Sequence, residues 1–251
     1  MLLKVGAFLA KGNYGVNSLN SNSDIPSSEK SSNMNIGANG KMMRGQIEPI
    51  MKIETMGDVW ALTDDDIRRI NINATQEIQR ETGMNHAESE DARKAMVDYL
   101  GGDYEAYRTG TKQEYIEKID RTLSLMSAYN GVIYRGNHFF NDREYNDFLD
   151  KIKNTRVFDM GGSVSSWSSE LKVAKRYSDY DDTAHSVIFV CKDNTASVGV
   201  QHISKFGKAE SEVLAPSGVK WKVKSITTKV SESGWNKTII EVSQEEYKYK
   251  K

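Results

Sequence analysis

Glu210 and Glu212 are two carboxylates one residue apart in the segment Lys208–Leu214, at the start of a predicted strand. Side chains alternate between the two faces of a strand, so we expect both carboxylates to look into one space. Like charges held that close separate their pKa values, which suits a pair in which one group stabilises a cation and the other handles a proton. The alternative for this pair alone is a solvated strand edge.

Arg135 stands near the end of a predicted strand, residues 131–136, upstream of the carboxylates. A guanidinium there can bind a phosphate or hold a carboxylate, and the ordinary alternative is a structural ion pair. Gly136 follows it and would let a ligand approach the backbone closely.

Serines dominate Ser163–Ser169, which leads directly into a predicted helix. Helix capping, or hydrogen bonding to other backbone groups, explains Ser168 or Ser169 well, because serine oxygens accept hydrogen bonds from backbone amides. Capping explains Ser165 and Ser166 poorly, so these two are candidate site residues.

The composition limits the function classes. The 34 Lys and Arg residues balance 35 Asp and Glu, a net charge of -1, and no global field attracts nucleic acid or an anionic membrane. The alternating lysines of residues 219–224 indicate the solvated face of a strand. The opening ten residues are too short to span a bilayer, so we expect no membrane segment. Cys191 is the only cysteine, which excludes an intramolecular disulfide and fits action in a reducing cytoplasm.

Helical patterns occupy the first half of the chain and strand patterns the second. Residues 1–45 are rich in Ser, Asn and Gly and predict a flexible arm, followed by a single domain over 46–251. That domain divides into a helical part, 46–130, and a β core, 131–245. Helices are predicted at 63–82, 89–100 and 111–130, the last opening with a capping box at Thr111–Glu114, and at 142–152 and 169–177. Strands are predicted at 131–136, 186–191, 196–203, 212–215, 219–226 and 238–242.

The strands do not alternate regularly with helices, so the pattern favours a mainly antiparallel α+β fold over a doubly wound sheet. The G-x-G-x-x-G fingerprint, the P-loop and the H-E-x-x-H motif are absent from the sequence. The four histidines have no spacing typical of metal ligands, and we expect no metal.

In chain order, three motifs resemble the R-S-E clade of mono-ADP-ribosyltransferases of the bacterial exoenzyme and bacteriophage type: Tyr134-Arg135-Gly136, Ser166-Trp167-Ser168 and Glu210-Ser211-Glu212-Val213-Leu214. Two further segments are similar to the same enzymes, the helix and turn Lys94–Tyr104 and the helix Val173–Tyr177. The resemblance covers roughly residues 87–242. It implies two small packed, mainly antiparallel sheets with N-terminal helices, and NAD+ bound between the sheets as co-substrate.

The resemblance also implies roles for the serine motif and the second carboxylate. Glu212 matches the catalytic glutamate, which hydrogen-bonds the ribose 2′-hydroxyl and stabilises the ribosyl cation. Ser166 matches the serine that orients this glutamate, and Ser168 completes the NAD-binding motif. The neighbouring Ser165 leaves the register open by one residue. Trp167 stands where threonine is common, and we expect it in the core.

The resemblance implies roles for four other positions. Arg135 matches the arginine that grips NAD+, and Gly136 matches the residue whose backbone contacts the nicotinamide amide. Glu210 matches the carboxylate that engages and helps deprotonate a target guanidinium, which points to arginine as the acceptor. Phe206 stands where the loop before the carboxylates carries an aromatic that contacts the protein substrate.

The implied activity is transfer of ADP-ribose from NAD+ to an arginine of a target protein, with release of nicotinamide. The partner is that target protein, with no nucleic acid and no membrane, and we expect a monomer. The implied settings are a toxin, an injected effector or a bacteriophage protein. One alternative is an NAD+ glycohydrolase on the same scaffold. Another is a non-catalytic binding module, which requires a decayed motif, and none of the three motifs is visibly decayed.

Overall fold

The structure is a computed structural model that describes residues 53, 55–101, 106–107, 111–160, 162–178, 182, 184–203 and 205–249. The predicted arm of residues 1–45 lies outside the described residues, so the division into an arm and one domain stays a prediction. Among the described helices, none is both long and apolar enough to cross a membrane.

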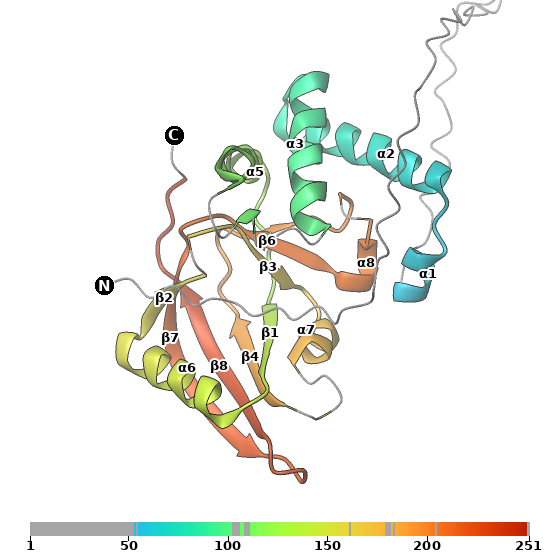
Figure 1. Ribbon diagram of the computed structural model, residues 1–251. Helices are drawn as coiled ribbons and strands as arrows, with labels where there is room; N and C mark the ends of the chain where they lie inside the picture. Colours follow the sequence, from blue (N-terminus) through green and yellow to red (C-terminus); the bar gives the residue numbers. More distant parts are fainter. Residues whose placement is uncertain are drawn as a thin grey trace, which may run out of the picture. The chain divides into compact units, whose positions relative to one another are not determined.

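Helices come first in the described chain and strands dominate its second half (Figure 1). In order, the elements are α1 (Met56–Trp60), α2 (Asp64–Thr82), α3 (His86–Leu100), α5 (Gln113–Leu125), β1 (Ile133–Phe139), α6 (Asp142–Thr155), β2 (Val157–Asp159), β3 (Ser165–Ser168), α7 (Leu171–Ser178), β4 (His185–Cys191), β5 (Val198–Gly199), α8 (Gly207–Glu210), β6 (Glu212–Ala215), β7 (Lys220–Val230) and β8 (Asn236–Gln244).

Local chemistry sets the ends of α2 as predicted. Thr63 accepts a hydrogen bond from the amide of Asp66, whose carboxylate accepts one from the amide of Thr63 at 3.0 Å. The helix ends at Gly83, which has the left-handed φ of 72° that glycine adopts without strain. The capping box predicted for α5 at Thr111–Glu114 is wrong, because the N-cap is Lys112 and it makes no side-chain cap hydrogen bond.

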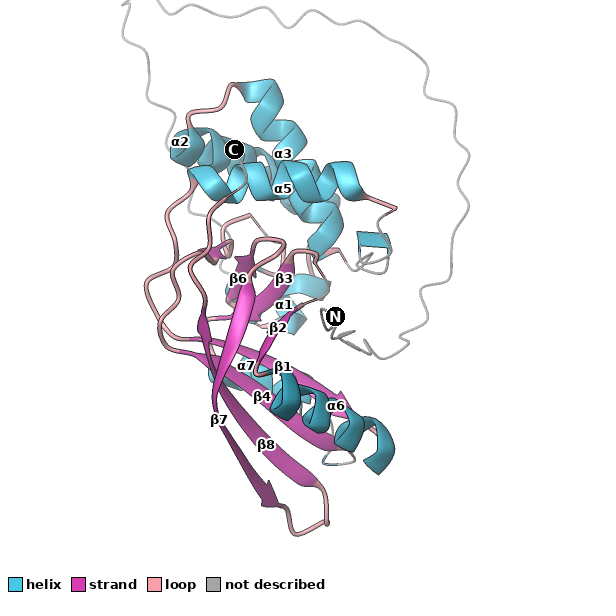
Figure 2. Ribbon diagram, turned by 90° about the vertical axis from the view of Figure 1, so that its left-hand side faces the viewer, coloured by secondary structure: helices cyan, strands magenta, loops and turns pink. Residues whose placement is uncertain are grey.

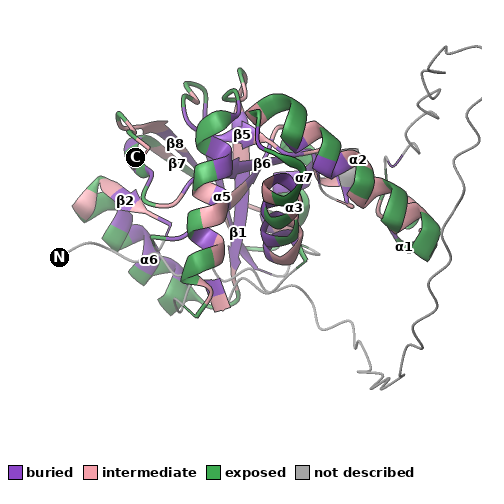
Figure 3. Cartoon of the chain, turned by 90° about the horizontal axis from the view of Figure 1, so that it is seen from above, coloured by how far each residue is buried: buried purple, intermediate pink, exposed green. Residues whose placement is uncertain are grey.

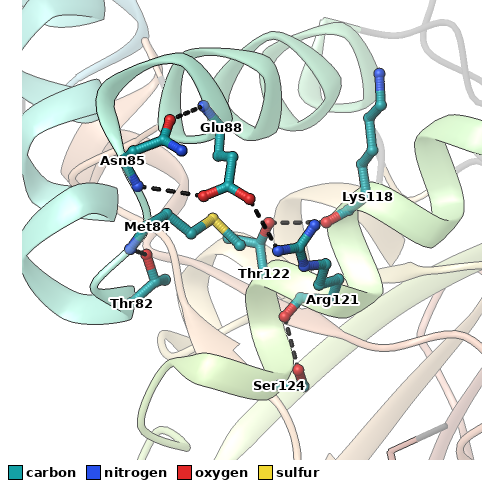
Figure 4. Close-up of polar contacts among 8 residues, drawn as sticks. All are labelled: Thr82, Met84, Asn85, Glu88, Lys118, Arg121, Thr122 and Ser124. Atoms are coloured by element: carbon teal, nitrogen blue, oxygen red, sulfur yellow. Dashed lines mark hydrogen bonds and ion pairs between the residues drawn. The ribbon is translucent and has the colours of Figure 1, made fainter. Parts of the chain in front are cut away.

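α3 begins at His86, three residues before the predicted start at Ser89. Asn85 and Glu88 form a capping box there, each side chain accepting a hydrogen bond from the other's amide (Figure 4). Glu88 also accepts a hydrogen bond from Arg121 of α5 at 3.0 Å. The Glu88 carboxylate therefore caps the N-terminus of α3 and also links α3 to α5.

The strands form an eight-stranded sheet in the order β2-β7-β8-β4-β1-β3-β6-β5, antiparallel except for β4 and β8. This confirms the mainly antiparallel α+β class. The sheet has two parts, β2-β7-β8-β4-β1 and β3-β6-β5, and Figure 2 shows β3 and β6 of the second part on the side of the sheet nearer α3 and α5. Among the described residues, the one register pair between the two parts is Tyr134 opposite Ser168. The two parts correspond to the two small packed sheets that the resemblance implies, and that one pair joins them into a single sheet.

Two apolar clusters hold the sheet in place. One packs α6 against β1, β4, β7 and β8 and includes Trp167, which is buried as predicted with its ring centroid 4.2 Å from that of Trp221. The other packs α2, α3 and α5 against the smaller part of the sheet, including Val198 and Leu214 (Figure 3). The smaller part is thus buried between the helical layer and the larger core.

Candidate active site

β3 and β6 pair antiparallel and bring the serine motif beside Glu212. Ser168 lies directly opposite Glu212, and Ser166 lies two residues before it on β3. Opposite residues of an antiparallel pair project from the same face, so Ser166, Ser168 and Glu212 share one face. Ser165 projects from the other face, where its hydroxyl accepts a hydrogen bond from the indole nitrogen of Trp167 at 3.2 Å. The geometry therefore favours Ser166 over Ser165 as the first serine of the motif.

The two carboxylates belong to different elements, so the predicted strand alternation is wrong for Glu210. Glu210 is the last residue of α8, and Glu212 is the first residue of β6. Ser211 between them has a left-handed backbone, with φ 44° and ψ 49°. This turn, and not the pleat of a strand, sets the directions in which the two carboxylates project.

Glu212 is nearly buried, with 5% of its surface exposed. Its backbone carbonyl accepts a hydrogen bond from the amide of Val200 at 2.9 Å, which fixes the start of β6. A carboxylate removed from water interacts more strongly with a positive charge that develops beside it. Burial therefore suits Glu212 to stabilise a cation.

Arg135 lies on β1 next to the single pair that joins the two parts of the sheet. It is 5% exposed, and its guanidinium donates a hydrogen bond to the backbone carbonyl of Ser166. The structure thus brings the predicted arginine to the predicted serine motif. A buried guanidinium is also the group expected to bind a phosphate in a fork.

Tyr177 of α7 is a site residue that lies in the predicted helix segment Val173–Tyr177 but in none of the three motifs. Its hydroxyl donates a hydrogen bond to Glu210 Oε1, and Nη2 of Arg176 lies 3.8 Å from the same oxygen. Burial, and then the charge of Glu210, raise the pKa of Tyr177, and the charge of Glu212 adds to the rise. The charges of both carboxylates therefore raise the pKa of the same phenol, although Tyr177 and Glu210 are 33 positions apart in the sequence.

Close packing places α7 over β1. A β-carbon on Gly136 would lie 2.0 Å from the carbonyl oxygen of Ala174, so only glycine allows this approach. His138 Nδ1 lies 3.0 Å from the carbonyl oxygen of Tyr177, and because a carbonyl only accepts, Nδ1 carries the proton. The space beside Gly136 that we expected a ligand to use is filled by α7. A backbone contact to nicotinamide stays a prediction.

Ser168 uses its hydroxyl inside the protein. The hydroxyl donates to the carbonyl oxygen of Glu210 at 2.8 Å and accepts from the amide of Glu170 at 3.0 Å. Because α7 begins at Leu171, these contacts satisfy backbone groups and do not cap the helix, and a contact of Ser168 with NAD+ stays a prediction.

Phe206 differs from the expectation of a ring available to a protein substrate. It is 7% exposed and packs with Ile53, Val59 and Ala209 beneath α1, which lies beside α8 in Figure 1. The Lys205 ammonium lies over the ring, 5.3 Å from its centroid. The sequence offered no signal for the burial of Phe206, because Ile53 and Val59, which pack against it, lie about 150 positions upstream. Across the described part of the chain, no three His, Cys, Asp or Glu side chains are grouped so as to hold a metal ion.

The sequence matches no protein-family model and no curated protein. Solved structures do resemble it. The crystal structure of the ADP-ribosyltransferase Vis from Vibrio splendidus, in complex with an inhibitor, aligns over 74% of this chain and 86% of its own, with 18% identity and a TM-score of 0.51.

Two other bacterial structures align less closely. Plx2a, an ADP-ribosyltransferase toxin from Paenibacillus larvae, aligns over 70% of this chain and 96% of its own, with 14% identity and a TM-score of 0.48. An ADP-ribosyltransferase from Clostridium botulinum aligns over 67% of this chain and 91% of its own, with 12% identity and a TM-score of 0.47. The alignment with Vis, together with the order of elements and the paired β3 and β6, leads to one conclusion about architecture: this chain has the ADP-ribosyltransferase fold.

Proposed function

We propose that this protein is a mono-ADP-ribosyltransferase that transfers ADP-ribose from NAD+ to an arginine side chain of a target protein. The observation that carries the proposal is the pair of carboxylates around Ser211, where a buried Glu212 and a Tyr177-bonded Glu210 lie at the junction of the two parts of the sheet. Two further observations support the same activity: the order of the three motifs resembles that of the R-S-E clade, and the chain has the ADP-ribosyltransferase fold.

The proposed reaction begins with cleavage of the bond between the ribose C1′ and the nicotinamide nitrogen. The electron pair of that bond moves to the nitrogen, neutral nicotinamide leaves, and positive charge develops on the ribose, as in glycoside hydrolysis. Glu212 is suited to stabilise that charge and to hydrogen-bond the ribose 2′-hydroxyl. Its burial strengthens the interaction because little water screens it.

In the proposed mechanism, Arg135 and the serine motif bind NAD+. The Arg135 guanidinium matches a phosphate of the dinucleotide in charge and in geometry. Its hydrogen bond to the Ser166 carbonyl holds it beside β3, so the anion it binds would lie near the face that carries Glu212.

Glu210 is suited to the acceptor step. A guanidinium nitrogen of the target arginine attacks C1′, and the proton that this nitrogen loses passes to the Glu210 carboxylate. The side chain of Glu210 is 11% exposed, and Tyr177 and Arg176 orient it. A carboxylate also pairs with a guanidinium in a fork, which supports arginine as the acceptor.

The test incubates the full chain with NAD+ and a free guanidine, agmatine, and measures nicotinamide release and ADP-ribosyl-agmatine separately. A small guanidine is used because it does not require knowledge of the target protein. We expect both products from the wild type. Glu212→Gln should lower both by about 100-fold or more, because the neutral amide removes the charge that stabilises the cation.

Glu210→Gln distinguishes transfer from hydrolysis. We expect this variant to lose the guanidine adduct while it keeps much of the nicotinamide release, because only the acceptor step needs this base. Equal loss of both products would contradict the role of Glu210. Nicotinamide and free ADP-ribose from the wild type, with no adduct to agmatine or to lysate proteins, would replace the proposal by an NAD+ glycohydrolase.

A further inference from the structure

The turn that separates the two carboxylates has an unusual backbone. Ser211 adopts φ 44° and ψ 49°, a left-handed conformation that residues with a β-carbon rarely adopt. α8 ends directly before it at Glu210, and β6 starts directly after it at Glu212. The conformation of this one residue therefore sets how the two carboxylates project relative to each other.

Contacts from the last residue of β3 and from the two residues that follow it hold this turn. The amide of Ser169 donates to the carbonyl oxygen of Ser211 at 2.8 Å, and the Ser168 hydroxyl donates to the carbonyl oxygen of Glu210 at 2.8 Å. These two contacts bind backbone. The Ser169 hydroxyl also donates to the carbonyl oxygen of Ser211, at 3.2 Å. The side chain of Ser211 is bound as well, since its hydroxyl donates to Oε1 of Glu170 at 3.1 Å.

Glu170 is itself fixed as an ionised acceptor. Its other oxygen, Oε2, lies 2.6 Å from the Lys172 ammonium. The hydrogen bond from Lys172 holds the pKa of Glu170 below its usual value. The carboxylate thus stays charged at neutral pH and accepts strongly from the Ser211 hydroxyl.

We propose that Glu170 is a positioning residue that holds Ser211 in its left-handed conformation and so sets the relative orientation of Glu210 and Glu212. Glu170 lies outside the three motifs of the sequence analysis and needs no contact with substrate for this role. The inference rests on the proposed function, because it assigns a use to the geometry of these two carboxylates.

The test compares four full-chain variants: Glu170→Ala, Ser211→Ala, Ser211→Gly and the double variant Glu170→Ala with Ser211→Gly. Loss of the contact in Glu170→Ala or Ser211→Ala should lower kcat for adduct formation by about tenfold, with a smaller change in KM for NAD+, because the carboxylates are then misaligned. Ser211→Gly should keep most activity, because glycine adopts this φ without support.

The double variant gives the decisive comparison. If Glu170 acts through the Ser211 backbone, glycine at 211 should restore most of the activity lost in Glu170→Ala. Glu170→Gln is the conservative control, since its amide oxygen accepts the same hydrogen bond and activity should be largely kept. Thermal unfolding of each variant shows that it is folded, and a general loss of structure would not be reversed by a second substitution.

The outcomes separate this inference from the proposed function. A wild type that leaves NAD+ intact overturns the proposed function and the inference with it. An active wild type overturns the inference alone if Glu170→Ala is unimpaired, or if the double variant is as slow as Glu170→Ala or slower.

Discussion

Tyr177 acts at the scale of single residues, through its hydroxyl on the Glu210 carboxylate. Burial and the charge of Glu210 raise the pKa of this phenol, so it keeps its proton at neutral pH and serves as a donor. Such a bond fixes one carboxylate oxygen and leaves the other to receive a proton from an acceptor. The phenol thus orients the proposed base without titrating itself.

Tyr177→Phe removes this hydroxyl and keeps the ring. We expect adduct formation with agmatine to fall by about three- to tenfold, because Glu210 loses a charge-assisted hydrogen bond, while nicotinamide release changes little. Parallel assays of both products check this. Tyr247→Phe is the matched control, since its hydroxyl donates to the Ser217 carbonyl at 2.9 Å in another part of the structure. An equal fall in both products would contradict the assignment to the acceptor step.

At the scale of elements, the approach of α7 to β1 decides where Tyr177 and Arg176 lie. Gly136 makes the approach possible, because a β-carbon there would overlap the Ala174 carbonyl. The hydrogen bond from His138 to the Tyr177 carbonyl holds the end of the helix on the same strand. Helix packing and site geometry therefore depend on the same contact.

Gly136→Ala should affect stability and activity together. We expect the free energy of unfolding to fall by about 1–3 kcal/mol from overpacking, measured by urea denaturation. Adduct formation should also fall, because a displaced α7 carries Tyr177 away from Glu210. Gly199→Ala is the control, since a β-carbon there meets only the Tyr129 ring at an ordinary 3.6 Å. A Gly136→Ala protein with wild-type stability would show that α7 is not packed this closely.

At the scale of the whole described fold, the helical layer supports the part of the sheet that carries Glu212. Leu214, two residues after Glu212 on β6, is fully buried in the cluster formed with α2, α3 and α5. The Tyr99 hydroxyl of α3 donates to the carbonyl oxygen of Val164, just before β3, at 2.9 Å. Helices distant in sequence therefore fix both strands of the candidate site.

Leu214→Ala should lower the free energy of unfolding by about 2–5 kcal/mol, because it leaves a cavity between β6 and the helices. Chemical denaturation followed by circular dichroism measures the change. The control is Leu125→Ala on α5, which removes the same atoms from a residue that is 47% exposed. We expect its free energy of unfolding to change by no more than about 0.5 kcal/mol. Similar losses in the two variants would contradict a supporting role for this interface.

The sequence alone determined the features that local chemistry controls. The capping residues of α2, the α+β class and the bounds of β6 follow from caps, periodicity and β-branched residues close together in the chain. The burial of Trp167 followed from its apolar surface between serines. The order of the three motifs was also recognisable in the sequence, and the observed fold confirms the architecture that their resemblance implied.

Only the tertiary structure decided how the candidate site is assembled. A four-residue helix such as α8 is too short for a periodic pattern, so the placement of Glu210 depends on tertiary contacts such as the hydrogen bond from Ser168, the last residue of β3, to its carbonyl oxygen. The contact of Tyr177 with Glu210 and the burial of Phe206 under α1 join residues far apart in the chain. Such contacts are chosen by packing across the whole fold, because each side chain's partner depends on elements that no local pattern can specify.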